Sequence, residues 1–353
     1  IKILSSNIYL KFCTIIVTFF WLPAVIMTED ISAHKLRLEH WMSDLPAQLK
    51  NVPLIYLAIP GSHDSMTYGI DRSSTVAPDA EPILHQLYPL FRGTILRWTI
   101  TQASDTWQQL LIGIRYLDLR LATKPNDDKF YFTHGLYGQE ISSALDQVKQ
   151  FIETHPGEVI TLDFQHFYGF SRDDHVRLMK YLQNLYGPRL VWRPVNMLDV
   201  TLDFLNRANR RIIVVYRNNT AQEWSEFWQP NMLPSPWPQQ DSIAGLTAFF
   251  TNIRRHPGSG FVHQAVLTPT PTFIVLRWIS SLREKCAVPV LNEMLPIISQ
   301  FSPGPPSGGN ETRATVNVVI ADFVDMNNAK FPRSIIDLNM KLLGRTDIHH
   351  QYG

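Results

Sequence analysis

The stretch Leu57–Asp71, with the sequence LAIPGSHDSMTYGID, decides how the rest of the chain is interpreted. The apolar run over residues 54–59 stops at a Pro-Gly pair, a pattern that predicts a buried strand entering a tight turn. His63 and Asp64 follow at once, so an imidazole and a carboxylate stand where a strand meets a loop. In a barrel of parallel strands, catalytic residues occupy such strand ends. The plainer alternative is a helix N-cap, in which Ser or Asp caps the helix and the histidine is incidental.

Composition limits the classes of protein to be considered. The 353 residues are 45% hydrophobic and 18% charged, a globular balance that suits one large domain or two medium ones. The formal net charge is +1 and no long block of Lys or Arg occurs, so we expect no nucleic-acid partner. The two cysteines, Cys13 and Cys286, indicate neither a disulfide framework nor a Cys-rich zinc site.

Residues 1–27 form an atypical apolar segment. The run 13–27 is largely apolar, too short for a membrane span and close in length to the core of a signal peptide. Residues 24–27 make a poor cleavage site for a signal peptide. We therefore expect Met27 to be the natural start of the protein. We expect the protein to be cytoplasmic, with secretion as the alternative that the apolar segment leaves open. Residues 28–345 are then one domain and residues 346–353 a tail.

Strand and helix patterns alternate along this domain. Further strands are expected at 113–121, 130–133, 158–164, 211–216, 262–267 and 315–321. Helices are expected at 33–49, 104–111, 141–154, 171–186, 200–208, 274–299 with a break at Pro289, and from after residue 325 through Leu342. Segment 72–103 is irregular and is expected to be an insertion at the rim. Alternating strands and helices pair in parallel through right-handed crossovers, so the fold class is α/β, a single (β/α) barrel.

Polar side chains recur where these strands end. Strand 113–121 places Asp118 and Arg120 on one face and three leucines on the other, so the charged pair is expected to point into the barrel mouth. Because downstream strand ends converge on one mouth, residues distant in the sequence meet there. The full set is His63, Asp64, Asp118, Arg120, His134, Asp163, Arg217 and Asp322.

Two histidines, carboxylates and an arginine are the groups that a metal-free phosphodiester cleavage needs. One histidine takes the proton of the attacking hydroxyl, and the other gives a proton to the leaving oxygen. A carboxylate behind each ring fixes its tautomer and stabilises the imidazolium. The arginine neutralises charge on the phosphoryl oxygens with a bidentate geometry that lysine lacks.

Six motifs carry a family resemblance. The chain resembles the X domain of phosphatidylinositol-specific phospholipase C and, more narrowly, the small eukaryotic proteins that consist of little but this domain. The motifs occur in the family's order and are PGSHDSMTYG (60–69), GIRYLDLRL (113–121), THGLYG (133–138), EVITLDF (158–164), IIVVYRN (212–218) and NVVIADFV (317–324).

The resemblance implies a distorted TIM barrel that cleaves phosphatidylinositol-type lipids to diacylglycerol and a cyclic inositol phosphate, the inositol 2-hydroxyl attacking phosphorus. His63 then corresponds to the general base and His134 to the general acid, which Asp64 orients. Asp322 is the best match to the carboxylate behind the base, with Asp325 in reserve. The lipid partner implies peripheral contact with a membrane surface, and the oligomeric state is left open.

The cofactor expectation depends on Arg120. The resemblance also bears on calcium. Multidomain eukaryotic enzymes of the phosphatidylinositol-specific phospholipase C family carry acidic calcium ligands on this strand, whereas the bacterial enzymes carry an arginine at the second of those ligand positions. The sequence has Asp118 followed by Arg120, which is the bacterial arrangement. A fixed positive charge there repels Ca²⁺ and takes over part of its role, so we expect no metal, with Ca²⁺ as the alternative. Asp118 itself either pairs with Arg115 or Arg120 or takes part directly in catalysis.

Weaker matches concern the substrate pocket. Arg217, Asp163 and Asp241 lie near the family's headgroup-binding positions, but the stacking aromatic expected two residues after Asp241 is replaced by Ile243. The aromatic cluster 224–250 is expected to be mostly core, and its exposed members would suit a membrane interface.

Two rival functions stay open. The first is a phosphodiesterase for another glycerophosphodiester, although the HRG-type opening and the Glu-Asn-Thr motif of such enzymes are absent from the sequence. The second is a catalytically weak lipid-binding or scaffold protein that keeps the pocket.

Overall fold

The computed structural model describes residues 37–306 and 315–344. These residues belong to one unit that begins at Arg37. The expectations for residues 1–27 and for the tail 346–353 lie outside the described residues, and the domain boundaries drawn from the sequence stay predictions. None of the helices in the described ranges is both long and apolar enough to cross a bilayer.

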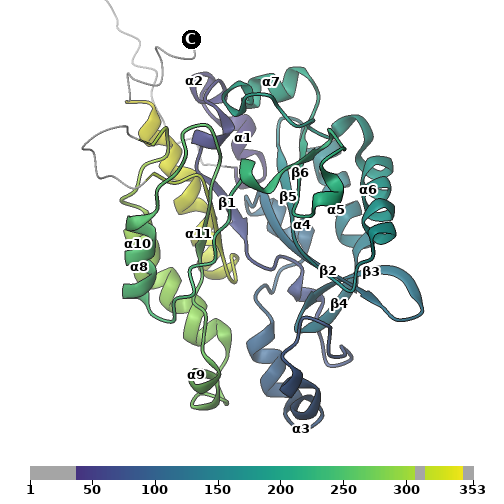
Figure 1. Cartoon of the computed structure of the whole chain (residues 1–353). Coiled ribbons are helices and arrows are strands. Elements are labelled where there is room, and N and C mark those ends of the chain that lie inside the picture. Colours follow the sequence, from purple (N-terminus) through teal and green to yellow (C-terminus); the bar gives the residue numbers. More distant parts are fainter. Residues whose placement is uncertain (1–36, 307–314, 345–353) are drawn as a thin grey trace, which may run out of the picture. The chain divides into compact units, whose positions relative to one another are not determined.

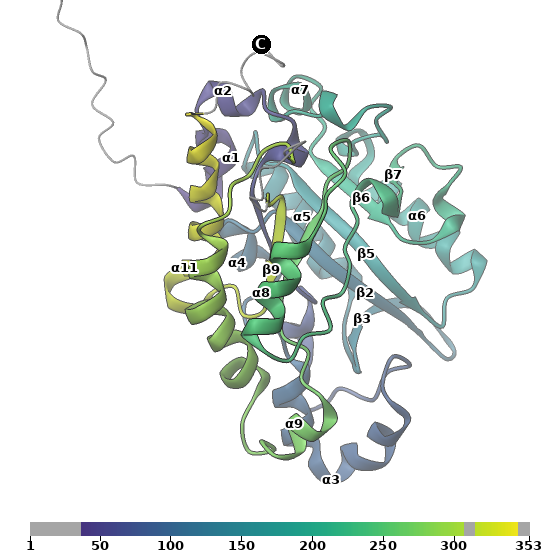
Figure 2. The same cartoon turned by 60° about the vertical axis from the view of Figure 1, so that its left-hand side comes forward.

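Seven parallel strands form the curled sheet at the centre (Figures 1 and 2). Their order is β7-β6-β5-β2-β1-β9-β8, and no pairing among the described residues joins β7 to β8, so the barrel is open there. The fold is therefore α/β, a distorted TIM barrel, as the sequence predicts. The strands are β1 (Ile59–Ser62), β2 (Tyr116–Lys124), β5 (Ile160–Tyr168), β6 (Ile212–Tyr216), β7 (Phe227–Trp228), β8 (Val262–Ala265) and β9 (Val318–Ala321).

An antiparallel hairpin extends this sheet at β2. Strand β3 (Asp127–His134) pairs antiparallel with β2, and β4 (Leu136–Glu140) pairs antiparallel with β3. The hairpin replaces the short strand expected at 130–133. Gly135, with φ of 68°, makes the tight turn between β3 and β4, a backbone conformation that glycine adopts without strain.

Helices pack outside the sheet, and leucines of the strands fill the space between them. Leu117, Leu119 and Leu121 are fully buried on the outer face of β2, which confirms the two-faced pattern of this strand. The helices are α1 (Trp41–Asp44), α2 (Ala47–Lys50), α3 (Pro82–Thr99), α4 (Thr106–Leu111), α5 (Ile141–Thr154), α6 (Arg172–Tyr186), α7 (Leu202–Arg207), α8 (Ile243–Asn252), α9 (Pro271–Val275), α10 (Leu295–Ile298) and α11 (Met326–Asp337).

The first strand lies later in the chain than expected. Residues 54–56 form a 3-10 turn, and β1 includes Pro60 and Gly61 rather than ending before them. A Cβ on Gly61 would lie 2.8 Å from Ile320 and Tyr116 side chains, so glycine allows the neighbouring strands to approach closely. The predicted turn is thus part of the sheet, and His63 follows β1 directly.

Segment 72–103 is not irregular, because most of it is helix α3. Pro82 starts this helix, where its missing N–H costs nothing. Pro89 is accommodated by a kink at Phe91 (φ −119°, ψ 26°).

Two other helix predictions are also corrected. The described part of 33–49 is a 3-10 turn followed by α1, and Pro46 separates α1 from α2. Pro289 does not break the later helix: it is helical (φ −58°, ψ −43°) and lies between two π-helical turns.

Candidate active site

His63 leaves the barrel at the end of β1, and its backbone is held from two sides. Its N–H donates to the carbonyl of Ala321 on β9. Its own carbonyl accepts from Gln102 Nε2 at 2.9 Å, and the same amide donates to Ala321. The next residue, Asp64, has φ of 40°, a left-handed conformation that short polar residues tolerate best. The turn therefore fixes both side chains at the barrel mouth.

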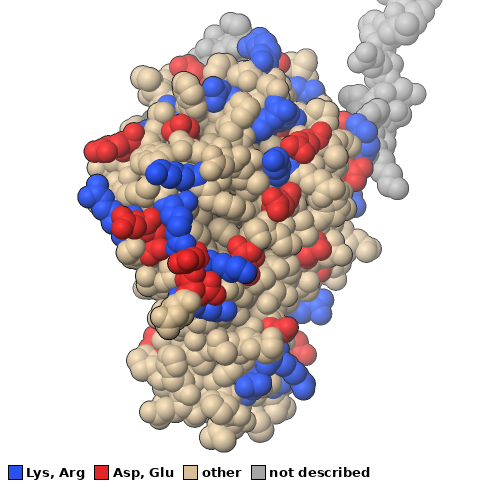
Figure 3. Space-filling model, turned by 90° about the vertical axis from the view of Figure 1, so that its right-hand side faces the viewer, with Lys and Arg blue, Asp and Glu red and all other residues tan. Residues whose placement is uncertain are grey.

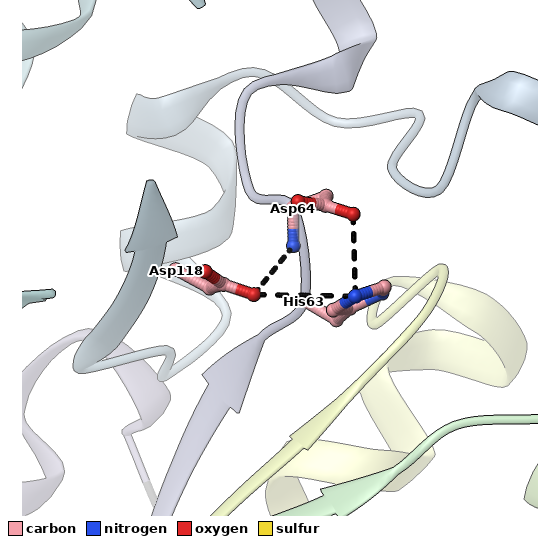
Figure 4. Close-up of side chains that lie close together, drawn as sticks. All are labelled: His63, Asp64 and Asp118. Atoms are coloured by element: carbon pink, nitrogen blue, oxygen red, sulfur yellow. Dashed lines mark hydrogen bonds and ion pairs between the residues drawn. The ribbon is translucent and has the colours of Figure 1, made fainter. Parts of the chain in front are cut away.

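Both ring nitrogens of His63 face carboxylates. Nδ1 lies 2.7 Å from Asp322 Oδ1, and Nε2 lies 3.2 Å from Asp64 Oδ2. Figure 4 shows the ring turned toward Asp64 and Asp118. His63 is only 4% exposed, and burial lowers its pKa, but the charges of Asp64 and Asp322 outweigh burial and raise the pKa to about 9. The resting ring is therefore an imidazolium at neutral pH.

Arg120 on β2 balances the charge of Asp64. Its Nε lies 2.6 Å from Asp64 Oδ1, and its Nη2 lies 3.2 Å from His63 Nε2. Burial raises the pKa of Asp64, but the charges of Arg120 and His63 prevail and hold it at about 2. Asp64 is therefore ionised over the whole physiological range.

Asp118, also on β2, contacts this cluster. Its Oδ2 accepts from the backbone N–H of Asp64 at 3.3 Å and lies 4.0 Å from His63 Nε2. Burial, followed by the charge of Asp64, raises the pKa of Asp118 to about 6. The alternative in which Asp118 pairs with Arg115 is wrong, because Arg115 is buried on Glu158 instead.

His134 ends β3 and reaches the same oxygen of the Asp64 carboxylate as His63 does. Its Nε2 lies 3.3 Å from Asp64 Oδ2, and its Nδ1–H donates to the carbonyl of Thr99 at 2.7 Å. The ring centroids of His63 and His134 are 6.3 Å apart, and the His134 side chain is 25% exposed. Asp64 thus bridges two imidazoles, one buried and one open to the mouth.

Of the two carboxylates considered behind His63, Asp322 is the one that lies there. Asp325 accepts a hydrogen bond from Ser104 Oγ at 2.9 Å instead. The register of the turn after β9 separates them: Asp322 follows the strand directly, whereas Asp325 lies one turn further at the start of α11.

The residues expected to bind the headgroup are divided by the structure. Arg217 makes a bidentate ion pair with Asp163, at 2.8 and 2.7 Å, and Asp163 also accepts from the hydroxyl of Tyr116. Asp241 is exposed just before α8, and no hydrogen bond or ion pair links it to the histidine cluster within the described residues. Arg217 and Asp163 are therefore held in an ion pair with each other, whereas Asp241, in the described part of the chain, makes no hydrogen bond or ion pair with this group.

Several residues at the site were not identified from the sequence. The ring of Trp237 lies against His63, 5.3 Å between centroids, and under the guanidinium of Arg120 at 5.9 Å. Most of the aromatic cluster is core as expected, with Phe227 and Phe250 fully buried, but Trp237 covers the site instead. Gln102 holds backbone carbonyls through its side-chain amide, and Thr99 uses its own backbone carbonyl, contacts that have no signature in the sequence.

The described residues contain a candidate group of metal-ligand atoms, those of His63, Asp64 and Asp118, which lie within 4.8 Å of one another. Ca²⁺ takes about six to eight oxygen ligands, whereas this group offers two carboxylates and an imidazole. The guanidinium of Arg120 already lies against Asp64, so its charge opposes a cation at the same carboxylate. The residues present fit Ca²⁺ poorly.

Comparison with known proteins gives the family. No protein-family model matches the chain. The PI-PLC X domain-containing protein 3 of Mus musculus is 34% identical over 324 residues, which cover 89% of this chain and 97% of the relative. The chain belongs to the family of PI-PLC X domain-containing proteins. Protein 3 of Danio rerio is 35% identical over 327 residues, and protein 1 of Homo sapiens is 31% identical over 316. The family inferred from the six motifs is confirmed.

Two solved bacterial structures have the same fold. A variant phosphatidylinositol-specific phospholipase C from Staphylococcus aureus has a TM-score of 0.58 at 18% identity and covers 86% of this chain and 98% of its own. The enzyme from Listeria monocytogenes has a TM-score of 0.54 at 18% identity, with the same coverage. At this identity the likeness establishes the fold.

Proposed function

We propose that this X domain protein is a metal-independent phospholipase C for phosphatidylinositol-type lipids. The observation that carries the proposal is the pair His63 and His134, whose Nε2 atoms lie 3.2 and 3.3 Å from the same oxygen of Asp64, while Arg120 lies against the other oxygen of that carboxylate. A phosphodiester bound beside Arg120 would meet one imidazole for the attacking hydroxyl and a second for the leaving oxygen. That is the arrangement an in-line displacement at phosphorus needs.

The first step forms the new bond. The inositol 2-hydroxyl oxygen attacks phosphorus while its proton passes to His63 Nε2. Nε2 has a partner in both protonation states: it accepts from Arg120 Nη2 when neutral, and its charge lies 3.2 Å from Asp64 Oδ2 when protonated. Asp322 on Nδ1 holds the tautomer in which Nε2 is the free nitrogen. The pKa of about 9 means that the base is mostly protonated at neutral pH, so turnover should rise as the pH approaches 9.

The second half of the displacement breaks the bond to the lipid. His134 is a general acid, and its Nε2 proton goes to the diacylglycerol oxygen as the phosphorus–oxygen bond breaks. In the protonated ring, Nδ1–H donates to Thr99 O, and Nε2 lies 3.3 Å from the charged oxygen Asp64 Oδ2. Arg120 meanwhile neutralises the phosphoryl oxygens, and the products are diacylglycerol and a cyclic inositol phosphate.

Exposed apolar side chains at the rim of the barrel support the proposal that the substrate is a lipid in a membrane. Helix α3 and the turn after α9 lie together at the lower end of Figure 1, because Arg97 donates to the carbonyls of Trp278 and Ser280. Their exposed apolar side chains include Ile83, Leu90, Phe91, Leu276, Trp278 and Ile279. Figure 3 shows mostly uncharged side chains at the level of α3, apart from a group of charged ones at the right-hand edge, and more charged side chains above. Such a patch beside the mouth suits contact with a lipid surface that presents the substrate.

The test is the release of products from phosphatidylinositol vesicles, followed by ³¹P NMR. The wild type should form cyclic inositol phosphate, His63→Ala should not, and His256→Ala, which changes an exposed histidine away from the site, should match the wild type. Turnover of glycerophosphodiesters alone would favour the rival enzyme. Vesicle binding without any turnover would favour the scaffold and overturn the proposal.

A further inference from the structure

The two ends of segment 72–103 converge on His134. At its start, the Asp79 carboxylate accepts from Thr133 Oγ1 at 2.6 Å and from the Gly135 backbone N–H at 2.7 Å, so it holds the residues on either side of the histidine. At its end, the Thr99 carbonyl accepts from the ring itself. The histidine is thus fixed by a segment outside the parallel sheet.

Further backbone contacts align this segment with the hairpin turn. Ala77 N–H donates to the Gly135 carbonyl at 3.0 Å, and Tyr137 N–H donates to the Thr75 carbonyl at 2.9 Å. Residues 76 and 136 form an antiparallel bridge. Asp79 is the side chain that completes this edge, because it satisfies the N–H that the left-handed Gly135 turns outward.

We propose that Asp79 is a positioning residue for the general acid, holding the β3–β4 turn so that His134 Nε2 points at the leaving oxygen. The inference rests on the proposed function. Asp79 acts through Thr133 and Gly135, since these are its hydrogen-bond partners. Without the carboxylate, the turn loses two hydrogen bonds and the imidazole shifts relative to Asp64. A displacement of about 1 Å at a reacting group costs roughly a hundredfold in rate.

The experiment compares two soluble diesters of inositol phosphate, one with an alkyl leaving group and one with 4-nitrophenol. An alkoxide needs the proton of the acid, whereas nitrophenolate leaves without it, so only the alkyl diester reports on the acid. Asp79→Ala should lower kcat on the alkyl diester by roughly ten- to a hundredfold and on the nitrophenyl diester by at most about twofold. His134→Ala should show the same selectivity with a larger loss.

Two variants control for structure and charge. Asp79→Asn keeps an oxygen that can accept from Gly135 N–H and should recover most of the alkyl activity. Asp71→Ala removes an exposed carboxylate just before segment 72–103 that accepts from the N–H and Oγ of Ser73, and it should behave as the wild type. Exchange of the Gly135 amide hydrogen should be faster in Asp79→Ala, which reports on the turn whether or not either diester is cleaved.

The outcomes separate the two claims. Equal losses on both diesters, or no loss, in Asp79→Ala would overturn the inference while leaving the enzyme proposal intact if His134→Ala keeps its selectivity. An unchanged exchange rate at Gly135 would overturn the inference as well. A wild type that cleaves neither diester nor the lipid would instead refute the proposed function.

Discussion

His63 and His134 meet at one carboxylate but are held by different means. His63 is buried at the end of a sheet strand, with charged groups on both nitrogens and its backbone tied to β9. His134 lies in a hairpin outside the parallel sheet, a quarter exposed, with a backbone carbonyl on its inner nitrogen. The proton affinity of the first is set by charge, while the position of the second is set by a turn and a rim segment. Substitutions around them should therefore fail in different ways.

Removal of each imidazole should give the largest effects and the clearest contrast. His63→Ala should lower kcat by about a thousandfold or more on every diester, because the hydroxyl always needs a base. His134→Ala should lower kcat by as much on alkyl diesters, but it should lower kcat only slightly on a nitrophenyl diester. Steady-state rates on the two diesters provide the comparison. Identical leaving-group dependence in both variants would break the assignment of base and acid.

Arg120→Lys should lower kcat/KM by roughly a hundredfold. Lysine keeps the charge but loses the planar fork that reaches both Asp64 and His63 Nε2. The matched control is Arg172→Lys, at the first residue of α6, which should keep wild-type rates. Full activity in Arg120→Lys would mean that point charge alone suffices.

Asp322→Asn should lower the maximal rate by about tenfold and shift the pH profile. Asp322 raises the pKa of His63, so its loss must lower that pKa and move the rising limb of kcat/KM from near pH 9 to lower pH. The variant should therefore lose less activity at pH 6 than at pH 9. Asp325→Asn, whose carboxylate lies on Ser104, should leave the limb in place. An unshifted limb in Asp322→Asn would contradict the charge-controlled view of His63.

Leu90→Asp should give the smallest effect, and only on lipid. Leu90 is 78% exposed on α3, so the substitution removes apolar contact with a bilayer without disturbing the core. Turnover of vesicles should drop by a few-fold up to about tenfold, whereas a soluble diester should be cleaved at the wild-type rate. Vesicle flotation with the same variant reports binding directly. An equal drop in turnover of the soluble diester would mean that Leu90 affects the cleavage step rather than binding to the membrane.

The sequence predicts the position of site residues correctly where the local pattern and the chemistry of the side chains agree. The alternation of strand 113–121 placed Asp118 and Arg120 in the mouth, and the motif after β1 placed His63 and Asp64 there. The strand itself was misplaced because a Pro-Gly pair usually marks a turn, whereas here glycine lets two neighbouring strands come close.

Other parts depend on contacts that no local pattern encodes. Helix α3 was missed because its two prolines suggest a break, although one starts the helix and the other lies before a kink. Asp79 reaches a hairpin more than fifty residues away. Trp237 looked like one more core aromatic, and only the fold brings it onto His63.

The central claim is that two histidines and an arginine carry out the cleavage without a metal. The most direct measurement is the initial rate of inositol phosphate release from phosphatidylinositol vesicles in excess EDTA, with His63→Ala in parallel. We expect full turnover by the wild type in EDTA and no increase in its rate when Ca²⁺ is added. We expect no turnover by His63→Ala. Turnover that is abolished by EDTA and restored by Ca²⁺ would contradict the claim.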